Sequence, residues 1–497
     1  MHHIRTTKTA SNSTAVQIVK YVDRRMIIVN HVGSVHTVGD IETLKNIATD
    51  WIEKNTKQSS LFALDSKKSS QTILDQFEYV GVHFSFIYEV LHKILDRFKF
   101  FSFNNIILND LVIMRLFEPA SKLRSFELLQ EYFGISHRRQ TFYEELQKLV
   151  KLKNSVEKLV TKIAIEEFGF DFSLVFYDVT TLYFESFKAD ELRKNGFSKD
   201  CKSNQPQIVI GLMVNKFGFP VTYEIFEGNK FEGHTMIPVI QEFQKKHNIK
   251  TLTVVADSAM LSFDNIKALK KANLSYIVGA RIANQPISKI KEVSSVLNQK
   301  DSTSIRTETK HGTLICDFST KRYRKDKNEM EKQIKKAEAY LKKPSEMKRT
   351  KFLKNLDKGK YVLNAALKEK TELLLGIKGY CTNLNLEVSN QEVVNHYHQL
   401  WHVEQAFRIA KNDLQTRPIY HFKQDAVKTH ILICFMALAV SKYIELKTGM
   451  SIKATISSLK RVTDAKMRNT LTNEEHIMRT KLPENIIAIL QKLGLSY

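Results

Sequence analysis

The residues best suited to chemistry in this 497-residue chain lie between Tyr397 and Lys411, in the stretch YHQLWHVEQAFRIAK. A helix there would place Tyr397, Glu404 and Lys411 on one face, because residues seven apart drift by only about 20°. Arg408 follows Glu404 by one turn. A carboxylate flanked by a phenol and two cations suits a site that holds a metal ion and grips phosphates. An amphipathic helix with a solvated charged face would explain the same residues.

Two further carboxylates stand at the ends of candidate strands. Asp178 follows the apolar run LVFY, and Asp257 follows the run VVA. Ligands gather at strand ends in open α/β sheets, so both positions are functional candidates. Either aspartate alone is more often a cap of a turn or helix. Together with Glu404 they could form one acidic site.

The segment after Phe170 is predicted to form a mixed α/β sheet. Three strands joined by turns indicate an antiparallel meander, and two later strands alternate with helices that would pack on the sheet faces. A further strand pattern resumes at residues 371–384. The five strands expected first span residues 173–186, 207–215, 219–228, 251–257 and 274–280.

The charge of the chain indicates a polyanionic partner. With 76 Lys and Arg against 53 Asp and Glu, the formal net charge is +23, and nucleic acid is the first candidate. Residues 321–360 hold 16 Lys and Arg against 6 Asp and Glu. A charge so concentrated suits an arm that tracks phosphates, although a solvated surface helix would also explain it.

Residues 121–149 allow a helix-turn-helix. The second helix would begin near Arg138 and Arg139, and in such a unit the first turn of that helix reaches the major groove. Any helical hairpin has the same outline, so simple helix packing stays open.

The N-terminus carries no apolar core of signal-peptide length. The ten-residue apolar run Ile431–Val440 is shorter than a membrane span and is predicted to be a buried core helix. Four scattered cysteines without CxxC spacing argue against a zinc knuckle or a disulfide framework. We therefore expect a cytoplasmic protein with no membrane partner.

These patterns predict five regions. They are a small β-containing region at residues 1–85, a helical region at 86–170, a catalytic core at 171–284 and 372–447, a basic insertion at 285–371, and a C-terminal helical region at 448–497.

The order Asp, Asp, insertion, Glu resembles the DDE transposases of bacterial insertion sequences, which are built on an RNase H-like fold. The resemblance covers roughly residues 170 to 445 and includes the motifs YDVTTLYFE and VVADSAMLS. A signature of form Y-x2-R-x3-E-x6-K, typical of the insertion-sequence-four type, is matched by Tyr397, Glu404 and Lys411. Leu400 stands in the arginine position, so Arg408 could supply that phosphate contact instead.

The resemblance implies an RNase H-like core in which Asp178, Asp257 and Glu404 are the catalytic residues. They would hold two Mg²⁺ ions about 4 Å apart, for which Mn²⁺ can substitute. It also implies a homodimer in a synaptic complex with the terminal inverted repeats and target DNA. The residues expected to contact DNA are Tyr397, Arg408 and Lys411 in the signature stretch, Arg138 and Arg139 in the helical region, and Lys321, Arg322, Arg324 and Lys325 in the insertion.

Two other functions fit the same sequence. An RNase H-like nuclease would cut DNA without strand transfer, and a non-catalytic DNA-binding protein derived from a transposase would tolerate loss of any carboxylate. The presence of all three carboxylates favours an enzyme.

Overall fold

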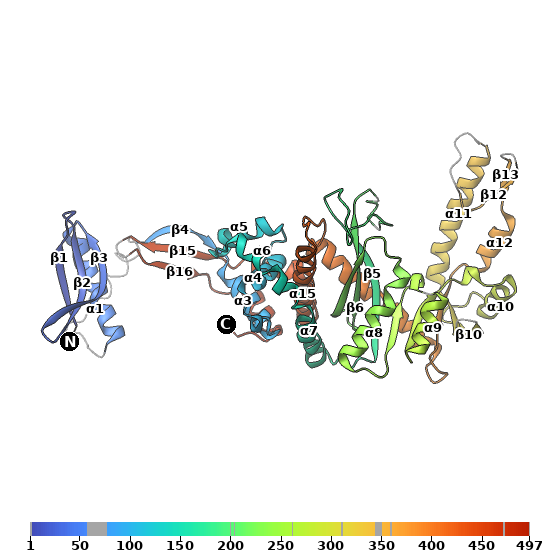
Figure 1. Ribbon diagram of the computed structural model, residues 1–497, viewed down its shortest axis with the longest axis horizontal. Coiled ribbons are helices and arrows are strands. Elements are labelled where there is room, and N and C mark those ends of the chain that lie inside the picture. Colours follow the sequence, from blue (N-terminus) through green and yellow to red (C-terminus); the bar gives the residue numbers. More distant parts are fainter. Residues whose placement is uncertain are drawn as a thin grey trace. The chain divides into compact units, whose positions relative to one another are not determined.

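The computed structural model describes residues 2–56, 77–198, 200–202, 204–260, 262–309, 312–342, 350–357, 360–470 and 473–496. Residues 343–349 and 358–359 of the basic stretch therefore lie outside the described residues. The chain forms two compact units (Figure 1). The first comprises Met1–Lys93, Glu127–Ser136 and Ala454–Tyr497, and the second Ile94–Phe126 and His137–Lys453.

The first unit begins with a small sheet and one helix. Strands β1 (His2–Lys8), β2 (Thr14–Val22) and β3 (Arg25–Val35) pair antiparallel in that order. Asp23 and Arg24 form the turn between β2 and β3, both with positive φ, as a two-residue hairpin turn requires. Helix α1 (Val38–Asn55) packs its apolar side against the sheet. This sheet lies within the region at residues 1–85 that was predicted to contain β-structure.

The first unit also contains a second three-stranded sheet. Strand β15 (Asp464–Asn469) pairs with both β4 (Phe77–His83) and β16 (Glu475–Arg479). The sequence predicted helix throughout this C-terminal region, but only α16 (Ile452–Leu459) and α17 (Glu484–Lys492) are helical there. These strands could not be predicted from local sequence patterns, because β15 near the C-terminus pairs with β4 in the N-terminal part of the chain.

The second unit is built on an eight-stranded mixed sheet. The strand order is β10-β11-β14-β9-β8-β5-β6-β7, in which β5, β8 and β9 are parallel and the other pairings are antiparallel. The strands are β5 (Leu174–Tyr183), β6 (Gln207–Val214), β7 (Pro220–Glu227), β8 (Thr253–Ala256), β9 (Ser275–Ala280), β10 (Ser304–Thr309), β11 (Gly312–Phe318) and β14 (Ile377–Thr382).

The meander β5-β6-β7 followed by parallel β8 and β9 confirms the five strands predicted first. The fold is the mixed α/β class expected for an RNase H-like core with largely helical flanking regions. The stretch predicted as a basic insertion contributes two strands to this sheet. Its strands β10 and β11 extend the central sheet through β14, because β11 pairs antiparallel with β14 over six residues.

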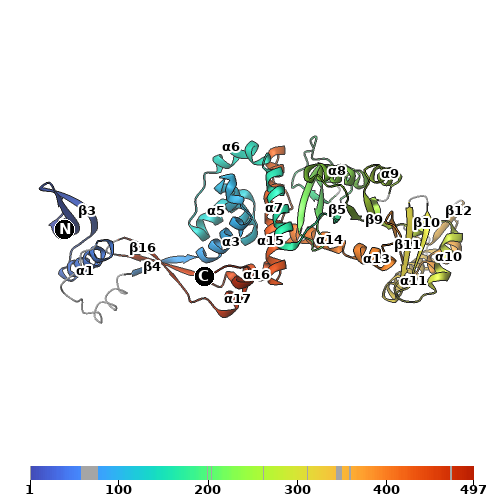
Figure 2. The ribbon, with the colours of Figure 1, turned by 90° about the horizontal axis from the view of Figure 1, so that it is seen from below.

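Helices cover both faces of this sheet. Helices α8 (Met236–His247) and α9 (Phe263–Lys271) lie on one face, and α13 (Asn390–His398) and α14 (Trp401–Arg408) lie on the other (Figure 2). Helix α14 packs on β5 and β6, whereas α13 packs on β8, β9, β10 and β14. The segment predicted to carry Tyr397 and Glu404 therefore crosses the sheet over the strands that carry the two aspartates.

Helices α4 (Ile106–Phe117), α6 (Arg139–Val150) and α7 (Lys153–Phe168) pack against α15 (Gln424–Thr448). By length and composition α15 could cross a membrane, yet 94% of its most apolar window is buried inside the protein. Its centre contains the run Ile431–Val440, so the prediction of a buried core helix is confirmed.

The remaining elements belong to the insertion or connect the two units. The insertion contributes α10 (Ile287–Leu297), α11 (Thr320–Lys342), the β12–β13 hairpin (Leu353–Asp357 and Lys360–Leu363) and α12 (Ala365–Leu373). Helices α3 (Ser85–Arg97) and α5 (Lys122–Phe133) each contribute residues to both units.

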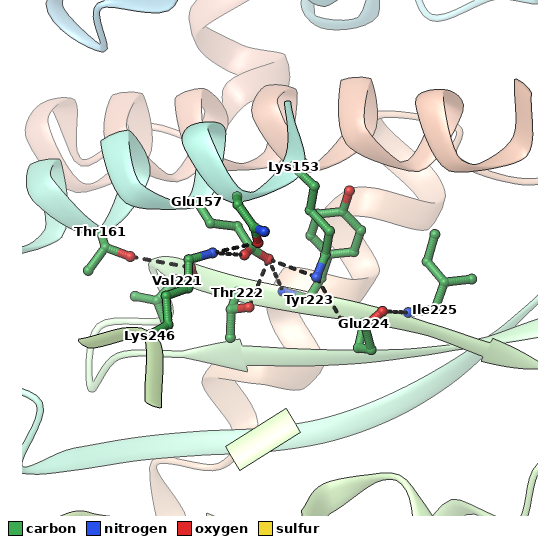
Figure 3. A network of polar contacts seen from close by, with 10 residues as sticks. Lys153, Glu157, Thr161, Val221, Thr222, Tyr223, Glu224, Ile225 and Lys246 are labelled. Atoms are coloured by element: carbon green, nitrogen blue, oxygen red, sulfur yellow. Dashed lines mark hydrogen bonds and ion pairs between the residues drawn. The ribbon is translucent and has the colours of Figure 1, made fainter. Parts of the chain in front are cut away.

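A buried carboxylate joins α7 to the meander (Figure 3). Glu157 accepts hydrogen bonds from Thr222 Oγ1 (2.8 Å) and the Tyr223 backbone N–H (3.2 Å). It also pairs with Lys246 Nζ at 2.5 Å and Lys153 Nζ at 3.6 Å. Burial alone would lower the pKa of Lys153, but Glu157 and Glu224 raise it above its usual value. Glu157 thus fixes the helix to strand β7.

We expect Glu157→Gln to destabilise the protein by about 2–3 kcal/mol, because it removes the charge from a buried and fully engaged carboxylate. Glu166→Gln on the same helix is the matched control, since both side chains of the Glu166–Lys162 pair are about half exposed. The control should lose less than about 0.5 kcal/mol. Chemical denaturation followed by circular dichroism measures both, and equal losses would contradict this role for Glu157.

Candidate active site

Neighbouring parallel strands bring Asp178 and Asp257 together. Strands β5 and β8 pair in register with Tyr177 opposite Ala256, and each aspartate is the next residue. Paired strands lie about 4.8 Å apart, so the two carboxylates occupy adjacent positions. Asp178 is partly exposed within β5, and Asp257 is exposed just past the end of β8. The strand ends predicted from sequence therefore converge.

The segment 397–411 is not one regular helix, which corrects the expectation that Tyr397, Glu404 and Lys411 share a face. Tyr397 lies near the end of α13, Glu404 on α14, and Lys411 in a π-helical turn at Ile409–Asp413. Between α13 and α14 the chain makes i to i+3 hydrogen bonds, including Leu400 N–H to Tyr397 O (3.0 Å). The tighter junction and the wider π turn change the angular spacing that a regular helix would give.

Tyr397 reaches the sheet and contacts Asp257. Its hydroxyl donates to Asp257 Oδ1 at 3.2 Å, and its side chain is 5% exposed. A Cβ on Gly279 of β9 would lie 2.5 Å from Tyr397 Oη, so glycine leaves room for this hydroxyl. Burial and the nearby Asp257 raise the pKa of Tyr397, which keeps the phenol protonated as a donor. The predicted DNA-contacting tyrosine is thus placed to orient a carboxylate.

Lys378 of β14 adds a cation that the sequence reading did not single out. Its Nζ lies 4.4 Å from the centre of the Tyr397 ring. Burial and the Arg322 guanidinium lower the pKa of Lys378, whereas the carboxylates of Asp257 and Glu404 act in the opposite sense. Both carboxylates therefore lie close enough to influence this ammonium. The sequence feature that could have indicated a role for Lys378 is its position as the one lysine among apolar and small residues in the strand IKGYCT.

A pocket of about 870 Å³ opens beside Asp257. It is bounded by the ends of β9 and β14 and by the insertion helices α11 and α12. Cations outnumber carboxylates in its lining, which favours a phosphate-bearing ligand. Its charged residues are Asp257, Arg281, Arg322, Asp326, Glu329, Lys351, Lys370 and Lys378.

The other signature residues do not all face this pocket. Leu400, in the arginine position, is 5% exposed and belongs to the core. Lys411 Nζ pairs with Asp200 Oδ2 at 3.3 Å, and Arg417 holds the other oxygen of Asp200 at 3.3 Å. Arg408 is exposed on α14. The structure thus pairs Lys411 internally, and its contact with DNA stays a prediction, as does that of Arg408.

The helix-turn-helix candidate corresponds to α5 and α6. Arg138 precedes α6 and Arg139 opens it, and both are exposed. The Arg139 guanidinium lies 5.5 Å from the centre of the Tyr143 ring. His137 is turned inward instead, with Nε2 2.5 Å from the buried carboxylate of Asp110. DNA contact by the two arginines stays a prediction.

The basic cluster of the insertion lies in the first turns of α11. Lys321, Arg324 and Lys325 are exposed. Arg322 pairs with Asp326 at 3.5 Å and lines the pocket beside Asp257. Of the four predicted DNA contacts in this helix, Arg322 is therefore the one nearest the candidate carboxylates.

The donor chemistry of the site suits a hard divalent cation. Asp178, Asp257 and Glu404 offer carboxylate oxygens, which Mg²⁺ prefers. In the part of the chain that the structure describes, however, no three His, Cys, Asp or Glu side chains are grouped to hold a metal ion. Glu404 is exposed on α14. Metal ligation by these three residues stays a prediction.

In the DNA cleavage that the sequence resemblance implies, we expect Tyr397→Phe to slow the reaction about tenfold, because Asp257 loses an orienting hydrogen bond. The thermal unfolding midpoint should hardly change, since ring burial is kept. Tyr380→Phe is the control, because the Tyr380 hydroxyl lies 3.4 Å from His398 Nε2 and has Asp317 as its neighbouring carboxylate. Initial rates at saturating DNA measure the effect, and equal rates for the two variants would argue against this role for Tyr397.

The mixed sheet, with Asp178 and Asp257 at adjacent strand positions, is consistent with an RNase H-like core. The chain belongs to the transposase DDE domain family, whose family model matches residues 169–440. That family consists of enzymes that hydrolyse phosphodiesters.

Solved transposase structures also match this chain. The piggyBac transposase in a synaptic complex with hairpin DNA is 12% identical, with 71% of this chain and 69% of that chain covered and a TM-score of 0.38. The Mos1 transposase in a paired-end complex with the left transposon end is 12% identical, with 32% and 50% covered and a TM-score of 0.16. Comparison with curated proteins gives no match.

Proposed function

We propose that this protein is a DNA transposase of the insertion-sequence-four type, which cleaves DNA at the ends of an insertion sequence and joins them to target DNA. One observation carries the proposal. Asp178 and Asp257 occupy adjacent strand positions, and Tyr397 of the signature segment donates a hydrogen bond to Asp257. Acidic and basic side chains lie together around this contact. A phosphodiester substrate requires both, because carboxylates hold metal ions and cations bind phosphate oxygens.

The chemistry is two in-line phosphoryl transfers. In the first, a water oxygen bonds to phosphorus at the element end and gives up a proton, while the 3′-oxygen leaves and takes up a proton. In the second, that 3′-hydroxyl loses its proton as its oxygen bonds to a target phosphorus, and the 3′-oxygen of the target leaves and takes up a proton. Two Mg²⁺ ions, or Mn²⁺, held by Asp178, Asp257 and Glu404 would supply electrophilic activation at the attacking and leaving oxygens.

The residues around the carboxylates would position DNA. Tyr397 orients Asp257, while Lys378 and Arg322 are placed to bind non-bridging phosphate oxygens in the pocket. Lys378 and Arg322 would thereby take over the phosphate contact that Leu400 cannot make. The pocket's cationic lining supports this assignment more directly than the exposed Arg408 does.

The partners proposed are the terminal inverted repeats, target DNA and a second copy of the chain. The net charge of +23 favours DNA and opposes self-association until phosphates neutralise it. The synaptic homodimer would therefore form on end DNA, in a cytoplasmic, nucleoid-associated setting. Light scattering with and without end DNA tests this, and a stable dimer in the absence of DNA would contradict it.

The decisive experiment incubates purified protein and Mg²⁺ with a duplex that carries the element's own ends and a supercoiled target plasmid. A transposase yields nicked or cut ends and joined products. Cleavage without joining would replace this proposal with the nuclease reading. Binding to the ends without cleavage would support a non-catalytic DNA-binding protein, and a duplex with scrambled ends controls for sequence recognition.

A further inference from the structure

A second basic pocket lies away from the carboxylates. It has a volume of about 470 Å³ and is formed by α4, the connection from α4 to α5, α6, α15 and the segment that follows the π turn. Its titratable lining comprises Arg115, Lys122, Tyr143, Arg417, Tyr420, His421 and His430. No Asp or Glu is among the described residues that line it.

Two cations and one histidine of this pocket are buried, whereas Arg417 is partly exposed and pairs with Asp200. Arg115 and Lys122 are each 4% exposed, and His430 is 5% exposed. Burial of a cation without an opposite charge is strongly unfavourable. Elsewhere this chain pairs its buried cations, because Lys442 lies 2.9 Å from Glu445 and Arg193 lies 2.7 Å from Asp190. The second pocket therefore departs from the pattern of the rest of the protein.

The hydrogen bonds within the pocket do not neutralise Lys122. His430 Nε2 lies 2.9 Å from the Thr416 carbonyl, so this nitrogen carries the proton and donates it. Nδ1 of the same ring is then the acceptor for Lys122 Nζ at 3.3 Å. The contact found for this buried amine is thus a neutral imidazole, which supplies no negative charge.

Arg115 adds positive charge beside Lys122, whereas burial and these two cations lower the pKa of His421 to about 4 and keep its ring neutral. Arg115 Nη1 donates to the Leu414 and Gln415 carbonyls at 3.4 and 3.5 Å, which holds the guanidinium against the pocket. The His421 ring lies 5.6 Å from that of His430. Burial, then the charge of Arg115, lowers the pKa of Lys122 well below its usual value. A bound anion would reverse this by favouring the charged form.

We propose that this second pocket binds a phosphate group, held by the Arg115 guanidinium and the Lys122 ammonium with His421 as a further donor. A guanidinium and an ammonium together match the several acceptor oxygens of a phosphate. The phosphate comes either from a free anion or from the DNA backbone. Only the second source rests on the proposed transposase function.

Titration calorimetry of the full chain with inorganic phosphate tests the site, in buffer free of phosphate and sulfate. We expect one phosphate per chain, and we expect Lys122→Met to weaken binding roughly tenfold or more. Lys442→Met removes a lysine of similar burial that already has a carboxylate partner, so it should bind phosphate as the unaltered protein does. Absence of phosphate binding, or equal binding by Lys122→Met, would overturn the proposal. So would acetate binding as tight as that of phosphate.

Thermal unfolding separates a ligand site from a merely structural lysine. Without phosphate, Lys122→Met should raise the melting temperature, because it removes an uncompensated buried amine at similar volume. Lys442→Met should lower it, because Glu445 loses its partner. Added phosphate should raise the melting temperature of the unaltered protein and of Lys442→Met, but not that of Lys122→Met. A lower melting temperature for Lys122→Met in phosphate-free buffer would contradict the inference that Lys122 is buried without an opposite charge.

The source of the phosphate is resolved by repeating the titration on the complex with duplex DNA. Loss of phosphate binding in the complex assigns the site to the DNA backbone. Unchanged binding assigns it to a free anion. Neither readout needs cleavage, so an inactive protein would refute the proposed function and leave this test intact.

Discussion

Asp178→Asn, Asp257→Asn and Glu404→Gln are each expected to reduce DNA cleavage by on the order of 10²-fold or more. Each change removes one negative charge at nearly constant shape, so the sheet and α14 should fold as before. Asp178 and Asp257 come from neighbouring strands, so the carboxylate of one cannot occupy the position of the other. Cleavage assays with Mg²⁺ and gel-shift assays on the same duplex measure activity and binding separately.

The matched control for these substitutions is Glu329→Gln. Glu329 lines the same pocket as Asp257 but belongs to α11 of the insertion. It should retain most of the cleavage activity. Cleavage at a near-normal rate by any one of the three carboxylate variants would remove that residue from the catalytic set. Loss of DNA binding along with cleavage would show that the substitution acted on folding.

The second large effect concerns the basic turns of α11. Simultaneous replacement of Lys321, Arg322, Arg324 and Lys325 by Gln should flatten the dependence of log binding constant on log salt concentration. Each phosphate contact that is lost reduces that slope by about 0.9. Fluorescence anisotropy of labelled duplex across a range of salt concentrations gives the slope.

A control of equal charge distinguishes a DNA contact from a general loss of positive potential. Replacement of four exposed lysines of α8 and α9 removes the same charge from the face of the sheet that lies opposite α13 and α14. These are Lys245, Lys267, Lys270 and Lys271. The same slope change in both variants would mean that α11 is a solvated surface. A larger change in the α11 variant assigns the contact to the insertion.

The meander and the two parallel strands could be predicted because their burial is continuous. All eight residues of β6, for example, are buried, and such a run of apolar residues between turns is a local signal. Once these strands were predicted, their ends could be predicted too, and these ends indicated Asp178 and Asp257. Periodicity also identified the core of α15, whose apolar centre needs no partner to be recognised.

Pairings between distant segments could not be predicted in this way. Strands β10 and β11 lie in a stretch whose dominant feature is its charge, and their place in the sheet depends on β14. The break between α13 and α14 falls at Gln399 and Leu400, without a glycine or proline to mark it. Burial of Tyr397 and Leu400 against the sheet accompanies this break, and that is tertiary information.

The candidate site shows the same division. The identity of the three carboxylates came from their order along the chain, but the groups around them depend on packing. Lys378 enters from β14 and Arg322 from α11, while Lys411 is drawn to Asp200. Spacing in sequence had grouped Lys411 with Glu404 and had given no role to Lys378.

The pairing of β11 with β14 makes the insertion inseparable from the enzyme core. Residues of α10 and β11 share a hydrophobic cluster with Ile377 of β14, the strand that carries Lys378. Excision of residues 285–371 would open that cluster and expose the edge of β14, whose backbone groups would then be free to pair with other chains. A chain truncated in this way would aggregate rather than persist as a minimal core. Shortening during the evolution of such proteins would therefore have to begin at the hairpin β12–β13, outside the sheet.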